Sequence, residues 1–199
     1  WLADYSPMID LLSDGNHELS VMKAANINLM DRLARELRRS SKKCSVVHGG
    51  YGGWIRYMLN MSDGQSTGPR TSVKIRYYHG ASAGGDAPVT KGVIQTNRQA
   101  VYLPDANIVI NGHNHNAYYV PIQRERISNK GVQYFDIQHH IRIPGYKQNY
   151  GDGTNSWDVT RGSPPKPIGS FWVRLYMESN HGIKIQIVPE IDSPVPVSI

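Results

Sequence analysis

The sequence predicts a mixed α/β domain that gathers polar side chains at the carboxyl ends of its strands. Short apolar, β-branched segments are each followed by a polar turn, and an amphipathic segment with helical spacing lies between two of them. In an α/β protein the carboxyl ends of the strands meet at one edge of the sheet, where a site is usually built. We therefore expect the strands before these turns to be neighbours in one sheet.

The strongest of these signals is the segment 108–115, which reads Ile-Val-Ile-Asn-Gly-His-Asn-His. Side chains in an extended segment alternate between two faces, so His113 and His115 point the same way. Gly112 lets the backbone bend close to whatever the two imidazoles bind. Taken alone, the pair fits a solvated loop as well as it fits a ligand pair.

Two further turns shift the interpretation toward a site. Residues 15–18, Gly-Asn-His-Glu, follow the apolar run 8–12, and His79 follows the run 73–78. With the pair above, these turns bring together three imidazoles and the amide oxygen of Asn16, without sulfur. Such donors suit Mn, Fe, Zn or Ni better than Ca or Mg.

In these turns the sequence resembles the calcineurin-like metallophosphoesterases, and in particular their phage-type members. That family carries a Gly-Asn-His-Glu turn, a lone histidine after a strand and a Gly-His-x-His turn, in the order found here over roughly Pro7 to Ala117. The resemblance implies a layered β-sandwich flanked by helices. It also implies a hydrolase that cleaves phosphate esters, as a phosphodiesterase or a nuclease-like enzyme.

The resemblance also implies roles for the residues. Asn16, His79 and His113 would surround one metal ion, and His115 would bind a second. Two such ions about 3.5 to 4 Å apart would activate a bridging hydroxide and hold the phosphoryl oxygens. His17 would stabilise or protonate the departing oxygen, whereas Glu18 would orient its turn or cap the following helix.

The sequence departs from the family pattern before Gly15. Members of the family begin with Asp-x-His and Gly-Asp-x-x-Asp/Asn turns, which supply a bridging Asp and the remaining ligands, but no Asp-x-His occurs in the 199 residues. We expect that the N-terminal part of the fold is missing and that residues 1–199 are the C-terminal portion of a single domain. A catalytically inactive remnant, acting as a binding or structural module, therefore stays open as an alternative function.

Composition narrows the partners. A formal net charge of +6 favours an anionic partner, such as nucleic acid or another phosphate ester. Part of that charge forms a basic cluster, Arg38, Arg39, Lys42 and Lys43, at the end of the helix expected over 20–40. There it complements the helix dipole, an interpretation that we favour over a surface for nucleic acid. No apolar run is long enough to span a bilayer. The single cysteine, Cys44, excludes an internal disulfide and favours a reducing compartment, the cytoplasm of a bacterial or phage-infected cell.

The remaining segments predict mostly β structure. The glycine-rich stretch after His79 lacks the Gly-Lys-Ser/Thr ending of a P-loop, which excludes a nucleotide hydrolase of that type. His139 and His140 are adjacent in an expected strand, so they face opposite ways and cannot share a metal. We expect a helix over 89–100 and strands over 44–47, 55–61, 72–78, 117–124, 131–143, 170–178 and 183–189.

Overall fold

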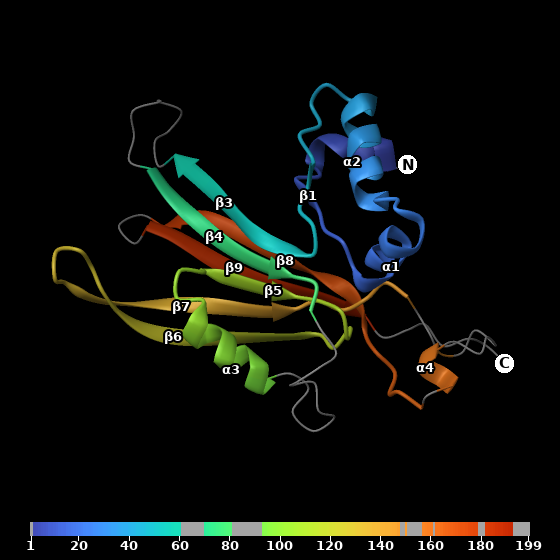
Figure 1. Cartoon of the computed structure of the whole chain (residues 1–199). Coiled ribbons are helices and arrows are strands. Elements are labelled where there is room, and N and C mark those ends of the chain that lie inside the picture. The colour runs from blue at the N-terminus through green and yellow to red at the C-terminus, as the bar shows by residue number, and fades with distance from the viewer. Residues whose placement is uncertain are drawn as a thin grey trace.

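A computed structural model describes residues 2–60, 70–80, 93–147, 150, 157–160, 162–178 and 182–192. The glycine-rich stretch 81–92 lies outside the described residues. The helical elements are η1 (Leu2–Met8), α1 (Asn16–Ala25), α2 (Leu29–Ser40), α3 (Val93–Tyr102) and α4 (Trp157–Thr160). The strands are β1 (Leu11–Leu12), β2 (Val47–His48), β3 (Gly52–Asn60), β4 (Arg70–Tyr78), β5 (Ile108–Asn111), β6 (Tyr118–Ile127), β7 (Gln133–Arg142), β8 (Ile168–Glu178) and β9 (Gly182–Asp192). The mixed α/β class is confirmed (Figure 1).

A five-stranded mixed sheet in the order β3-β4-β5-β7-β6 forms the centre of the molecule. The outer pairs are antiparallel, whereas β4, β5 and β7 run parallel. Tyr78 is in register with Asn111, so the turns that carry His79 and His113 leave the sheet side by side. This arrangement confirms that two of the three strands that precede the polar turns are neighbours.

One face of this sheet is apolar. The β8–β9 hairpin packs on it, because alternate residues of both hairpin strands are apolar and point toward the sheet. The buried centre consists of Val73, Ile75, Ile108 and Ile141. Burial of such side chains is worth about 1.5–3 kcal/mol each, and this core fixes the strands whose ends carry the histidines.

The opposite face of the sheet is polar although α3 covers it. Gln99 and Asn111 exchange two hydrogen bonds of 3.2 and 2.8 Å between helix and strand. Gln138 donates to the carbonyl oxygens of Leu103 and Ala106 at the end of the helix. Buried polar groups need such partners, because an unmet one costs roughly 1–3 kcal/mol. Gln138 of β7 therefore faces the segment that follows α3 rather than water.

The N-terminal residues pack beside the sheet as a smaller unit with its own core of Ala34, Leu37, Cys44 and Val46. The single helix expected over 20–40 is two helices. Asn26 adopts a left-handed conformation with φ of 53°, which ends α1. Asn28 then caps α2 by accepting a hydrogen bond from the backbone of Asp31 at 2.8 Å.

The expectation that the strand before Asn16 belongs to the central sheet is wrong. β1 has two residues and pairs in parallel with β2 in a separate small sheet. The loop that follows β2 connects the two parts. Gly50 accepts a hydrogen bond from the backbone of Asp14, and Tyr51 accepts one from the backbone of His79, each at 2.9 Å. Among the described helices, none is long and apolar enough to cross a membrane.

Candidate functional site at the ends of β4 and β5

Asn16, His79 and His113 come from three elements and converge at one point. Asn16 is the first residue of α1, His79 follows β4, and His113 follows β5. The Nε2 atom of His79 lies 3.0 Å from Oδ1 of Asn16 and 3.3 Å from Nδ1 of His113. The structure thus brings these three side chains together, as the motif order leads one to expect.

The two histidine turns are held in close contact by their backbones. Gly112 donates a hydrogen bond to the carbonyl oxygen of His79 at 3.0 Å. Gly80 has φ of +108°, and a Cβ atom there would lie 2.9 Å from the Gly112 carbonyl oxygen and 3.0 Å from Cβ of His113. A side chain at position 80 would therefore strain the backbone and push the turns apart.

Both histidines of the second turn have left-handed backbones. His113 has φ of 76° and His115 has φ of 56°. A non-glycine residue in this region costs of the order of 1–3 kcal/mol and persists where the surrounding structure holds it. Such outliers cluster at functional sites, and here the conformation aims the His113 ring at His79.

The donor and acceptor roles of these three polar atoms depend on the tautomers of the two rings. If Nε2 of His79 carries the proton, it donates to Oδ1 of Asn16; if it is unprotonated, it accepts from Nδ1 of His113. The cluster therefore brings together two ring nitrogens and one amide oxygen, all of them groups that can bind a metal ion, with the other two atoms 3.0 and 3.3 Å from Nε2 of His79.

The surroundings of His79 favour its neutral form. Burial lowers the pKa of His79 below its usual 6.5, and the neighbouring His113 lowers it further, while Glu18 opposes the effect. The rings of His79 and His113 meet edge to face at 5.2 Å, and Tyr51 packs against His79 at 5.1 Å in the same manner. Neutral imidazole is the form that binds metals.

The donor geometry fits one transition metal ion. Two nitrogens, each about 2.0–2.1 Å from a tetrahedral ion, lie about 3.3 Å apart, which matches the separation of the two imidazoles. Nowhere in the described part of the chain do three His, Cys, Asp or Glu side chains group closely enough to hold a metal. A third donor to such an ion would therefore have to be the Asn16 amide, whose Oδ1 lies 3.0 Å from Nε2 of His79.

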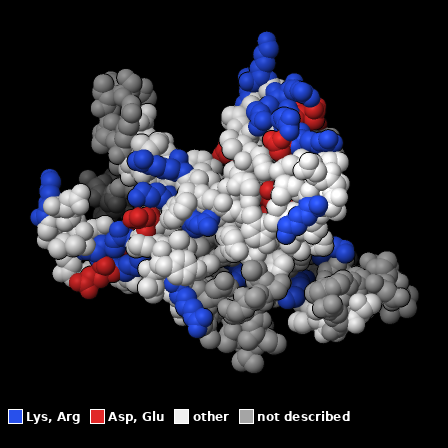
Figure 2. Space-filling model, viewed as in Figure 1, with Lys and Arg blue, Asp and Glu red and all other residues white. Residues whose placement is uncertain are grey.

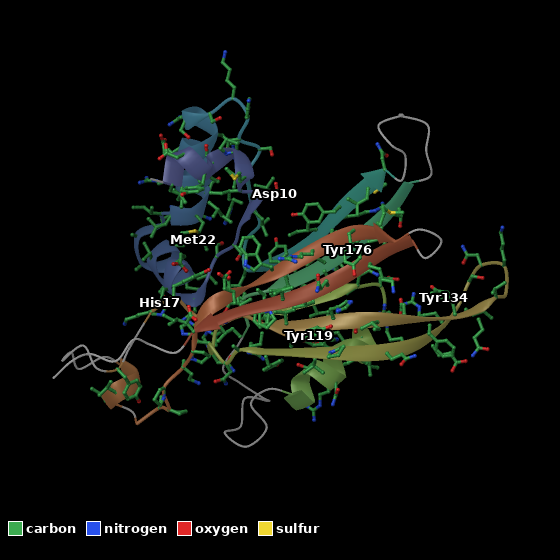
Figure 3. The ribbon with its side chains drawn as sticks, turned by 180° about the vertical axis from the view of Figure 1, so that it is seen from behind. Asp10, His17, Met22, Tyr119, Tyr134 and Tyr176 are labelled. Atoms are coloured by element: carbon green, nitrogen blue, oxygen red, sulfur yellow. The ribbon has the colours of Figure 1, made fainter. Side chains whose placement is uncertain are left out.

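The other predicted residues surround this centre. His17 is exposed at the start of α1, at the end of that helix nearest the sheet (Figure 3). The ring of His115 lies against Gly145, where an added Cβ would be 3.0 Å from its Nδ1. Glu18 accepts a hydrogen bond from the backbone of Gly15 at 2.9 Å, so it caps α1 as expected.

Three supporting contacts were not predicted. The buried Asp14 binds Nε2 of His48 with both carboxylate oxygens, at 2.9 and 3.0 Å. Tyr51 donates to the carbonyl oxygen of Gly80 at 2.7 Å and so fixes the turn after His79. Arg142 contacts the turn that carries His113. Asp14 could have been predicted from the sequence, because it directly precedes the turn 15–18. No local pattern links Arg142 to a turn 30 residues earlier.

Comparisons with known proteins add little to this description. No protein-family model matches the chain, and no curated protein matches its sequence. Among solved structures, the chain is similar to Vps29 complexed with Zn²⁺ from Entamoeba histolytica, with 12% sequence identity, 78% of this chain and 74% of that chain covered, and a TM-score of 0.28. A likeness this slight establishes neither a fold nor a function.

Proposed function

We propose that the protein is a metal-dependent phosphoesterase of the calcineurin-like type, acting on phosphodiesters. The observation that carries the proposal is the convergence of Asn16, His79 and His113 within 3.0–3.3 Å, in turns whose letters and order resemble that family. The fold agrees with a layered sandwich, because the β8–β9 hairpin packs on one face of the central sheet and α3 on the other.

The proposal assigns a role to each residue of the centre. Asn16, His79 and His113 would hold one divalent ion of Mn, Fe, Zn or Ni. Such an ion lowers the pKa of bound water and polarises a phosphoryl oxygen. His17 is exposed beside Asn16, where its ring could stabilise or protonate the departing oxygen. His115 would belong to a second metal position.

One observation favours a second candidate, a binding or structural module without catalysis. A two-metal phosphoesterase needs a carboxylate that bridges the ions, and none joins the three converging donors in the described residues. Glu18 is engaged in capping α1, and Asp14 is paired with His48. The isolated chain 1–199 is therefore expected to bind metal and to hydrolyse slowly.

Titration calorimetry with Mn²⁺, Zn²⁺ and Ni²⁺ tests the proposal. We expect at most one ion per chain, bound weakly, because neutral imidazoles bind such ions whereas the missing carboxylates would be needed to offset a second dication. Hydrolysis of bis(p-nitrophenyl) phosphate with Mn²⁺ is expected to stay near the rate of the metal alone.

The outcomes separate the candidates. Hydrolysis well above the metal-only rate, abolished by a chelator, would show that another carboxylate fills the bridging role and that the chain is a complete enzyme. Metal binding without hydrolysis, the result expected for residues 1–199, would support the proposed metal centre and show that this polypeptide by itself acts as a binding module. Absence of any metal binding would overturn the proposal.

We further infer that the anionic partner is nucleic acid, bound through the helix α2 and the residues after it. Residues 29–43 carry six basic and two acidic side chains, which Figure 2 shows as a basic surface over α2. Asp31 and Glu36 pair with Arg35 and Arg39 only as exposed ion pairs, which are weak. Phosphate backbones bind such surfaces with strong salt dependence.

Charge reversal tests this surface. We expect a triple variant, Arg32→Glu with Lys42→Glu and Lys43→Glu, to bind a single-stranded oligonucleotide at least tenfold more weakly in fluorescence anisotropy, with a shallower salt dependence. The control reverses the exposed Arg98, Lys130 and Lys147 instead, for the same change in net charge. Equal losses of oligonucleotide affinity in both variants would show that binding depends on the total charge of the protein and that α2 and residues 41–43 form no dedicated binding surface.

A further inference from the structure

Arg142, at the end of β7, is buried against the turn that carries His113. The residue is only 2% exposed to solvent. One guanidinium nitrogen, Nη1, donates to the carbonyl oxygen of Gly112 at 3.1 Å and to Oδ1 of Asn114 at 3.0 Å. The guanidinium also lies over the ring of Tyr118, with 5.7 Å between its central carbon and the ring centroid.

These two hydrogen bonds lie on either side of His113. Gly112 precedes the histidine and Asn114 follows it, so a single nitrogen ties both flanks of a residue whose φ is 76°. Charge-assisted hydrogen bonds are about twice as strong as neutral ones. They are therefore of the right size to offset the cost of the left-handed backbone.

The sheet places Arg142 directly beside the turn that carries His113. In the parallel pairing of β5 with β7, Arg142 is in register with Asn111, the residue before the turn. Asn111 is itself held by Gln99 of α3. The turn is thus held from the helix at its start and from β7 along its length.

We propose that Arg142 is a positioning residue that holds the His113 turn in its metal-binding conformation. The inference rests on the proposed function, which makes Nδ1 of His113 a ligand. Without Arg142, the backbone of His113 relaxes toward negative φ, and its ring swings away from the 3.3 Å approach to His79. Groups that orient metal ligands typically change metal affinity by 10–100-fold.

The sign of the effect distinguishes positioning from charge. A buried cation near a dication weakens metal binding by repulsion, so removing Arg142 would strengthen binding if electrostatics alone mattered. Positioning predicts the reverse. We therefore expect Arg142→Gln to lower the affinity for Zn²⁺ or Ni²⁺ at least tenfold in calorimetry, and Arg142→Lys to lower it less, because one ammonium keeps part of the bonding.

The matched control is Arg124→Gln. Arg124 is also largely buried, and it binds Asp136 and the carbonyl oxygens of Pro104 and Ala106. It lies six residues along β6 from Tyr118, which separates it from the Arg142 site by about 20 Å. We expect this control to lower the melting temperature and to leave metal affinity within about twofold. A loss of affinity in Arg124→Gln equal to that in Arg142→Gln would show a general effect of destabilisation.

A measurement without metal keeps the inference separate from the proposed function. Backbone NMR shifts of His113 and His115 report their left-handed φ directly in the metal-free protein. They are expected to move in Arg142→Gln and to stay in place in Arg124→Gln. Unchanged shifts, or unchanged metal affinity in Arg142→Gln, would overturn the positioning role. Failure of the wild-type protein to bind metal would overturn only the proposed function, because the shifts still test the turn.

Discussion

Replacing His113 with alanine is expected to lower the affinity for a divalent transition metal roughly 100-fold or more, since loss of even a supporting group costs 10–100-fold. His113 supplies one of only three converging donors, and its Nδ1 lies 3.3 Å from Nε2 of His79. His79→Ala should have the same effect. Calorimetry with Ni²⁺ at pH 7.5 measures both, and the folded state of each variant is checked by circular dichroism.

Two neighbouring histidines provide controls for this experiment. His17→Ala removes an exposed ring beside Asn16, and His115→Ala removes a ring packed against Gly145. Neither residue is one of the three proposed ligands of the single ion, although both rings lie near enough to lower the pKa of His79. Each variant should therefore retain metal affinity within about threefold. Full binding by His113→Ala, or loss of binding by His17→Ala, would show that the ligands are wrongly assigned.

The pH dependence of metal binding follows from the same histidines. Protons compete with the metal, so affinity should fall below about pH 6, near the ordinary imidazole pKa. Burial and the nearby His113 lower the pKa of His79, so this ring stays neutral to a lower pH than an exposed histidine. The contribution of His79 to the decline should therefore appear at a lower pH than that of an exposed histidine.

The convergence of His79 and His113 was predictable because it depends on local signals. Each residue follows an apolar β-branched strand directly, and parallel strands that are neighbours align their ends. The position of Asn16 was predicted only in part. The strand before it is limited to Leu11 and Leu12. Its place beside His79 depends on the loop after β2, in which Gly50 accepts a backbone hydrogen bond from Asp14 and Tyr51 accepts one from His79.

The polar face of the sheet could not be read from the sequence. In β7 the residues Gln138, His140 and Arg142 share one face, and the opposite face carries Ile137, His139 and Ile141. A polar face of this kind is typical of a strand with one side exposed to water. In the structure these side chains are covered, and all three residues are at most 2% exposed. Gln138 is covered by the segment that follows α3, and Arg142 by the turn that carries His113 and by the ring of Tyr118. These partners lie about 20 to 40 residues earlier in the chain, so the strand's own pattern carries no information about them.

That buried face gives the last prediction, a stability that falls in acid because of His140. Burial, together with the positive charges of Arg124 and His139, lowers the pKa of His140 from 6.5 to about 4. Nε2 of the neutral ring donates to the side-chain oxygen of Gln138 at 2.9 Å. Between pH 6.5 and 4 the unfolded chain binds a proton that the folded chain excludes, so the free energy of unfolding decreases as the pH falls through this window.

The size of the effect follows from the shift of the pKa. At 1.36 kcal/mol for each pKa unit, the loss attributable to His140 approaches about 3 kcal/mol near pH 4. Urea denaturation of the wild type and of His140→Gln from pH 7 to pH 4 measures it, because the variant lacks this titration and should lose about 3 kcal/mol less. His17→Gln removes an exposed histidine instead and should parallel the wild type. The prediction is that a buried imidazolium beside Arg124 and His139 destabilises the folded protein in acid. Parallel curves of unfolding free energy against pH for the wild type and His140→Gln would contradict it, because they would mean that the folded protein accommodates protonated His140.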